Sequence, residues 1–180
     1  MSFFFFWAGD EIGEHANVGV LCCRMFADID HRHPDVRRDI FYWTSWLSKQ
    51  VKLGGMRVDA IKHYSFEFLR DLIAHIHANV DPEWFIVGEY WRQDSEFLAR
   101  YVEFMGHKIS LFDVQLVSNF STVSLLEEKG DLRTVFDDAL VVWKPDNAVV
   151  SIRHQNPVTD EEVADLVIYC SRPLSLITIL

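Results

Sequence analysis

The sequence lacks both a lysine- or arginine-rich run and a long apolar run, and its formal net charge is −10. An acidic chain without a basic patch is a poor partner for nucleic acid or for anionic membranes, so we expect neither. No apolar stretch approaches the roughly 20 residues that a membrane-spanning helix needs. The three cysteines, Cys22, Cys23 and Cys170, are odd in number and follow no ligand spacing. They therefore predict neither a disulfide framework nor a zinc site.

The first residues, MSFFFFWAGDE, also lack the features of a secretory signal. No basic residue precedes the apolar run, the run is short, and Asp10 and Glu11 follow it at once. We therefore expect a cytoplasmic protein. The chain has 180 residues, of which 49% are hydrophobic, and this is enough for one globular domain with a core.

Apolar strands alternate with amphipathic helices through the middle of the chain. A helix is predicted from Pro34 to the Gly54-Gly55 pair, and Ser65 and Asp94 or Ser95 are expected to cap two more helices. Nearly continuous apolar segments at 56–61, 84–89 and 109–117 predict strands. This alternation is typical of a parallel sheet covered by helices, an α/β fold in which the carboxyl ends of the strands share one edge.

Two predicted strands end in carboxylates. Arg57 and Asp59 are two residues apart and so face the same side of one strand, and Glu89 ends the next strand. Neighbouring strands lie about 4.8 Å apart, so the two carboxylates can approach the separation of roughly 5–5.5 Å that retaining glycosidases use. We expect Arg57 to lower the pKa of Asp59, a nucleophile, and aromatic neighbours to raise the pKa of Glu89, a general acid. The alternative is a structural Arg–Asp pair and a surface glutamate.

Residues next to these carboxylates suit a neutral, hydroxylated ligand. Tyr90 and Trp91 follow Glu89 and offer aromatic faces to a sugar ring, although they can equally pack the junction between strand and helix. Lys62 lies just beyond Asp59 and can donate hydrogen bonds, whereas the adjacent His63 is more often structural than a ligand in such a position.

Read together, several segments resemble the alpha-amylases of glycoside hydrolase family thirteen, closest to the calcium-dependent liquefying type and its intracellular fungal relatives. The resemblance covers about residues 25–149 and rests on MFADIDHRHPDV, GGMRVDAIKHYSFEFLRDLIAHI, WFIVGEYW, SLFDVQLVSNF and DLRTVFDDALV. It implies part of a (β/α)₈ TIM barrel, because the chain supplies three or four of the eight strands. Residues 1–24 and 150–180 match nothing that we can place, and we expect a truncated product.

The resemblance also implies roles for individual residues. Asp59 matches the nucleophile, Glu89 the general acid/base, and Arg57 the arginine that orients the nucleophile, while Lys62 and Trp91 match positions near bound glucose. The implied reaction is retaining endo-hydrolysis of α-1,4-glucosidic bonds in starch- or glycogen-type glucans. The implied calcium ligands are Asp28 and the backbone carbonyl of His63.

The sequence also departs from the pattern that it resembles. Arg153 and Asn156 stand where a third carboxylate motif is expected, and Cys22 stands where a second calcium-binding Asp is expected. We therefore assign no third catalytic carboxylate and expect impaired activity. The alternatives are a glucan-binding remnant without turnover and an inactive fragment. The sequence does not indicate an oligomeric state.

Overall fold

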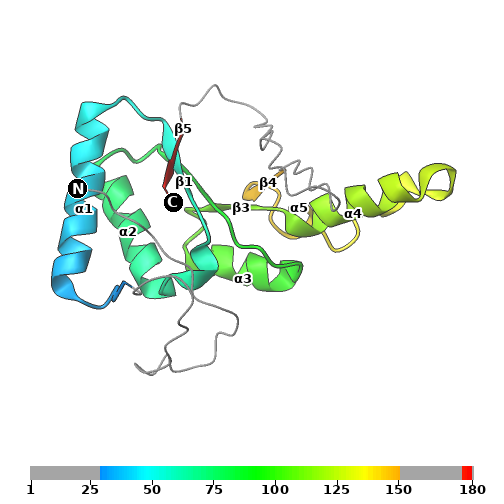
Figure 1. Ribbon diagram of the computed structural model, residues 1–180, viewed down its shortest axis with the longest axis horizontal. Coiled ribbons are helices and arrows are strands. Elements are labelled where there is room, and N and C mark those ends of the chain that lie inside the picture. The colour runs from blue at the N-terminus through cyan, green and yellow to red at the C-terminus, as the bar shows by residue number, and fades with distance from the viewer. Residues whose placement is uncertain (1–28, 151–175, 180) are drawn as a thin grey trace.

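A computed structural model describes residues 29–150 and 176–179 of the chain (Figure 1). Short strands alternate with helices, as the sequence predicts. The helices and strands in chain order are α1 Pro34–Gln50, β1 Gly55–Val58, α2 Phe66–Asn79, β2 Phe85–Gly88, α3 Ser95–Phe104, β3 Ser110–Phe112, α4 Val114–Leu125, α5 Leu140–Trp143, β4 Ala148–Val149 and β5 Leu176–Ile179. Single 3₁₀ turns cover Ile61–His63, Glu127–Lys129 and Leu132–Thr134.

The strands form one sheet in the order β4-β3-β2-β1-β5, and every neighbouring pair is parallel. The strands β1 to β4 lie side by side in chain order, and helices connect them. This is the arrangement of consecutive strands in a (β/α)₈ barrel, so the expected α/β class and partial barrel are confirmed. In the segment 150–180, which the family resemblance left unplaced, residues 176–179 form β5 beside β1. Residues 1–24 lie outside the described part of the chain.

Alternate residues of the strands face opposite sides of the sheet. Met56, Val58 and Ile86 belong to the main core, together with the buried faces of α2 and α3. Arg57 lies between Met56 and Val58, so its side chain leaves the other face. The outward face thus carries apolar packing against the helices, and the inward face carries the ionisable groups.

The predicted helix starts are confirmed. Ser65 Oγ accepts a hydrogen bond from the Phe68 backbone N–H at 3.3 Å, and an Asp94 oxygen accepts one from Phe97 at 2.9 Å. Each cap satisfies an amide at the helix start that has no partner within the helix. Pro34 is the first residue of α1, as expected.

The strand predicted over 109–117 is wrong beyond Phe112, because α4 begins at Val114. Asp113 stops the strand: its side chain accepts a hydrogen bond from the Leu116 backbone N–H at 3.0 Å and so caps α4. The strand predicted over 56–61 also ends early, at Val58, because Ala60 has a left-handed backbone with φ of 48°.

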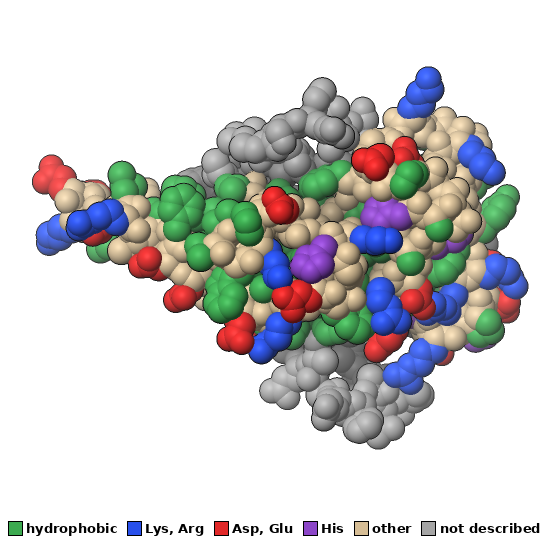
Figure 2. Space-filling model, turned by 180° about the vertical axis from the view of Figure 1, so that it is seen from behind, with side chains coloured by type: hydrophobic (Ala, Val, Ile, Leu, Met, Phe, Trp, Pro, Cys, Tyr) green, Lys and Arg blue, Asp and Glu red, His purple; other side chains and the backbone are tan. Residues whose placement is uncertain are grey.

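The helix α4 projects from the rest of the described chain (Figure 1). Apolar side chains gather along this projecting part on the face shown in Figure 2, and Phe120, Leu125 and Leu126 on it are exposed. No described helix is both long and apolar enough to cross a bilayer.

Two glycines, one on β1 and one on β2, lie where there is little space for a side chain. A Cβ added at Gly55 would overlap the backbone carbonyl oxygen of Phe85, whereas one at Gly88 would lie 2.5 Å from the tip of the Ile61 side chain. A side-chain tip can move, but the backbone of a paired strand cannot move without breaking the pairing. Gly88→Ala should therefore cost about 1–3 kcal/mol of unfolding free energy, and Gly55→Ala should cost more. Chemical denaturation of both variants measures this, and equal losses would contradict it.

Candidate active site

The ends of β1 and β2 bring Asp59 and Glu89 side by side. Val58 pairs with Gly88 in the parallel register, and Asp59 and Glu89 are the next residue on each strand. The backbone continues the contact: the Glu89 N–H donates to the Val58 carbonyl at 2.9 Å, and the Ile61 N–H donates to the Glu89 carbonyl at 3.0 Å. Parallel neighbours at one level point to the same side of a sheet, so both carboxylates lie on its inward face.

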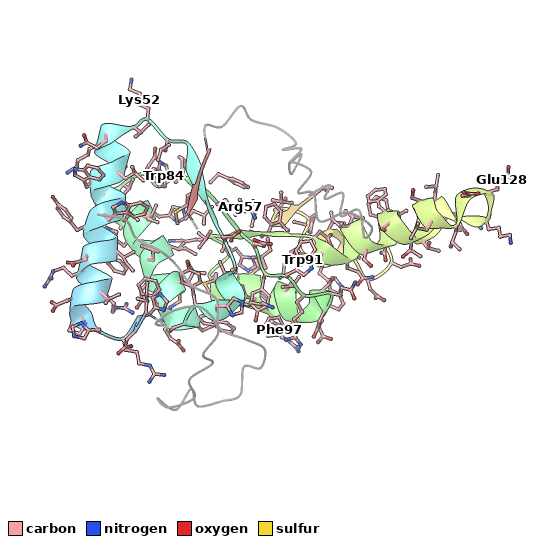
Figure 3. The ribbon with its side chains drawn as sticks, in the orientation of Figure 1. Lys52, Arg57, Trp84, Trp91, Phe97 and Glu128 are labelled. Atoms are coloured by element: carbon pink, nitrogen blue, oxygen red, sulfur yellow. The ribbon has the colours of Figure 1, made fainter. Side chains whose placement is uncertain are left out.

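Arg57 joins the two carboxylates. Its Nη2 atom donates to Asp59 Oδ1 at 2.8 Å and to Glu89 Oε2 at 3.0 Å. The three side chains are 20%, 27% and 18% exposed in the order Arg57, Asp59, Glu89, so water screens these contacts less than it screens surface ion pairs. Figure 3 shows Arg57 near the middle of the strands.

The distance between the carboxylates bears on the reaction type. Because both oxygens lie within hydrogen-bond distance of one nitrogen, they are at most about 6 Å apart. Inverting glycosidases separate their carboxyl groups by roughly 6.5–9.5 Å to admit a water, whereas retaining enzymes use about 5–5.5 Å. This close approach of the two oxygens favours the retaining arrangement over the wider inverting one.

The two carboxyl groups also interact directly, and this sets their ionisation. Burial, followed by a hydrogen bond with Glu89 and the charge of Glu89, raises the pKa of Asp59 to about 6, although Arg57 opposes the change. Burial alone would raise the pKa of Glu89, but hydrogen bonds with Asp59 and Arg57, the charge of Arg57 and a hydrogen bond from Ala60 together lower it. In the ligand-free molecule these opposite shifts favour protonation of Asp59 over protonation of Glu89.

The expected pKa directions were thus wrong for both carboxyl groups. Arg57 does not serve Asp59 alone, because its Nη2 atom also reaches Glu89. The aromatic neighbour expected to raise the pKa of Glu89 lies elsewhere: Tyr90 is 2% exposed and packs in the core, with its ring centroid 5.1 Å from that of Tyr101.

The structure separates the two candidate sugar-stacking residues. Trp91 is 41% exposed and follows β2, at the same end of the strand as Glu89. Figure 3 also labels Trp84, which is buried and lies at the opposite end of β2. Tyr90 is buried, so the idea that it offers a face to a sugar is wrong. Lys62 lies in the 3₁₀ turn that follows Asp59, where the sequence placed it.

The proposed calcium site is only partly described. His63 ends the 3₁₀ turn Ile61–His63, but Asp28 lies outside the described residues, as do Cys22, Arg153 and Asn156. Within residues 29–150 and 176–179, no three His, Cys, Asp or Glu side chains form a group that could hold a metal. The described residues do not by themselves fit a calcium ion, so calcium stays a prediction from resemblance.

Sequence reasoning missed two residues beside the carboxylates. The Arg57 guanidinium carbon lies 5.5 Å from the ring centroid of Phe112, which ends β3. Burial, with a smaller contribution from the nearby Asp59 charge, raises the pKa of Tyr64 to about 12. Phe112 could have been found as the third strand-end residue in a row, but the predicted strand 109–117 placed that end too late.

Comparison with known proteins finds relatives that match most of the chain. No family model matches the chain. The chain is 32% identical over 174 residues to an alpha-amylase of Bacillus licheniformis, a match that covers 97% of this chain and 33% of that protein. It is 30% identical to a glucan 1,4-alpha-maltohexaosidase of Bacillus sp. (strain 707), covering 94% of this chain and 32% of that protein. Among solved structures, an Anoxybacillus alpha-amylase aligns with a TM-score of 0.49 and 26% identity over 53% of this chain and 21% of that one.

These relatives are by name glycoside hydrolases, and the chain is homologous to a part of them. More narrowly, the chain is a homologue of the bacterial alpha-amylases of the family-thirteen type. It spans about a third of the length of the curated relatives that it matches most fully.

The shared arginine makes a prediction about the pair. In a Glu89→Gln variant, Asp59 loses the neighbouring carboxylate that raises its pKa and gains Arg57 for itself, so its pKa should fall from about 6 toward the ordinary value of 3.8. Carboxyl carbon shifts followed by NMR against pH measure this. Glu96→Gln is the control. Glu96 pairs with Arg100 on the exposed face of α3, so this variant should leave the pKa of Asp59 unchanged. A pKa of Asp59 still near 6 in Glu89→Gln would contradict the direct coupling.

Proposed function

We propose that the chain carries the reacting carboxylate pair of a retaining hydrolase that acts on α-1,4-glucosidic bonds in starch- or glycogen-type glucans. The observation that supports it is the contact of one Arg57 nitrogen with Asp59 and Glu89 on neighbouring strand ends. The similarity to alpha-amylases supports the choice of α-glucan as the substrate class.

The chemistry divides between the two acids. Glu89 protonates the glycosidic oxygen as its bond to the anomeric carbon breaks, and the Asp59 carboxylate attacks that carbon to form a glycosyl ester. Glu89 then removes a proton from water, and the water oxygen displaces Asp59 and releases the sugar. Arg57 stays beside the Asp59 carboxylate through both steps and stabilises its negative charge when it leaves.

The ligand-free structure needs one change before this sequence can begin. The raised pKa of Asp59 and the lowered pKa of Glu89 favour a proton on Asp59, whereas the first step needs it on Glu89. The two carboxyl groups share a hydrogen bond, so one proton shift along it converts the resting form into the reactive form. A bound glucan displaces water from the pair and supplies the leaving oxygen as a new hydrogen-bond partner for the protonated Glu89.

Covalent trapping tests the roles without requiring efficient turnover. A 5-fluoro-α-glycosyl fluoride carries a good leaving group that needs no acid, so Asp59 should form a stable glycosyl ester with it even in Glu89→Gln. Mass spectrometry of peptides should find the added sugar on Asp59 and none in Asp59→Asn. Hydrolysis of unactivated maltooligosaccharide should fall about 10²–10⁴-fold in Glu89→Gln. Labelling of another residue, or none in the wild-type chain, would contradict the proposal.

A second candidate function is glucan binding without turnover, and the exposed Trp91 favours it. A stacked indole contributes on the order of 1 kcal/mol or more, so Trp91→Ala should weaken binding of maltooligosaccharide about tenfold. Trp46→Ala is the matched control, because Trp46 is 46% exposed and lies on α1, away from the carboxylates. Calorimetric titration measures both variants. An equal loss in both, or in neither, would remove Trp91 from the binding site.

A further inference from the structure

We propose that Phe112 is a positioning residue: its ring holds the Arg57 guanidinium where one nitrogen can reach both Asp59 and Glu89. The position of the ring comes from the fold alone. Its importance for catalysis rests on the proposed function.

Phe112 stands at the same level of the sheet as the two carboxylates. Gly88 pairs with Leu111, so the next residues, Glu89 and Phe112, are neighbours on adjacent strands. Together with Asp59 they form a row across β1, β2 and β3 on the inward face. Arg57 starts two residues below this row and extends toward it, and its guanidinium carbon lies 5.5 Å from the Phe112 ring centroid. This distance is within the range of an attractive contact between a cation and an aromatic face.

The ring cannot easily move. Phe112 is 3% exposed, and the residue after it is fixed by three hydrogen bonds. Asp113 Oδ1 accepts from the Leu116 N–H at 3.0 Å, Asp113 Oδ2 accepts from the Val141 N–H at 2.8 Å, and the Asp113 N–H donates to the Val149 carbonyl at 2.9 Å. The fully buried Asp113 thus links the end of β3 to α4, α5 and β4. These bonds restrict the backbone next to Phe112 and so the position of its ring.

Such support matters because an arginine side chain is long and loses much rotamer entropy when it is fixed. An unsupported guanidinium can satisfy one carboxylate fully and leave the other. The ring prevents this, because a guanidinium held over the Phe112 face stays within hydrogen-bond distance of both carboxylates. The ring does this without competing for the carboxylates, since an aromatic face accepts no proton and offers none.

Replacing Phe112 by pentafluorophenylalanine tests the contact with little change of shape. Fluorination reverses the sign of the ring quadrupole, so the attraction to the guanidinium is lost while the side chain still fills its site. We expect rotation about the Arg57 Cζ–Nε bond, measured by ¹⁵N NMR on the ligand-free chain, to become about fivefold faster. The pKa of Asp59 should rise, because the opposing charge of Arg57 is held less firmly.

The same exchange at Phe68 is the matched control. Phe68 is 1% exposed, and its ring lies 5.4 Å from the guanidinium carbon of a different arginine, Arg37. It should therefore loosen Arg37 and leave Arg57 unchanged. Ordinary variants add a second comparison: Phe112→Leu should loosen Arg57 as fluorination does, and Phe112→Tyr, which keeps an electron-rich ring, should restore it.

Unchanged Arg57 rotation in both the fluorinated protein and Phe112→Leu would overturn the proposal, as would equal changes at Arg57 from the Phe112 and Phe68 exchanges. These readouts need no substrate. Loosening of Arg57 without covalent trapping on Asp59 would support the positioning role and count against the hydrolase, and trapping with unchanged Arg57 would do the reverse.

Discussion

One nitrogen of Arg57 donates to two carboxylates, and the surrounding strands are arranged as that contact requires. Asp59 and Glu89 must end neighbouring parallel strands in register, since a shift of one residue would send one of them to the helix-covered face. Glycines allow the strands to meet closely, because any Cβ at Gly55 would overlap the backbone of β2. The register of β1 and β2 is therefore a condition of the site as well as of the fold.

Burial of Asp59 beside Glu89 has a cost in stability. A group whose pKa is raised on folding stabilises the fold when it is protonated, so the contribution of Asp59 is complete below its ordinary pKa of 3.8 and is lost as the pH rises through about 6. At neutral pH the loss amounts to about 1–3 kcal/mol for a half-buried carboxylate. Glu89 acts in the opposite direction. Because its pKa is lowered on folding, it stabilises the fold above its ordinary pKa of 4.5, and this contribution is lost as the pH falls through the lowered value. The contributions of the two acids to the free energy of unfolding therefore change in opposite directions with pH.

The sequence predicted the parallel sheet, the helix caps and the meeting of Asp59 with Glu89, because each depends on local pattern or on strand order. It predicted the pKa directions wrongly, because they depend on which oxygens one guanidinium reaches. The burial of Tyr90 was also missed, since adjacent aromatic residues give no sign of which one packs inward. The end of β3 was misplaced because Asp113 turns an apolar run into a helix cap, and that requires the amides of Leu116 and Val141 to be in place.

The cluster of Arg57, Asp59 and Glu89 needs only a small part of a barrel. Three consecutive strands supply it: β1 gives Arg57 and leads to Asp59, β2 leads to Glu89, and β3 ends in the Phe112 ring. None of these contacts depends on closure of the sheet into a ring of eight strands. Binding a glucan chain is different, because it needs walls on several sides of the sugar. Among the described residues, Lys62 and Trp91 follow the same strand ends as the pair. Under the proposed function, nucleophilic attack on an activated sugar therefore needs only the pair and Arg57, whereas cleavage of a long polymer also depends on surfaces beyond the pair.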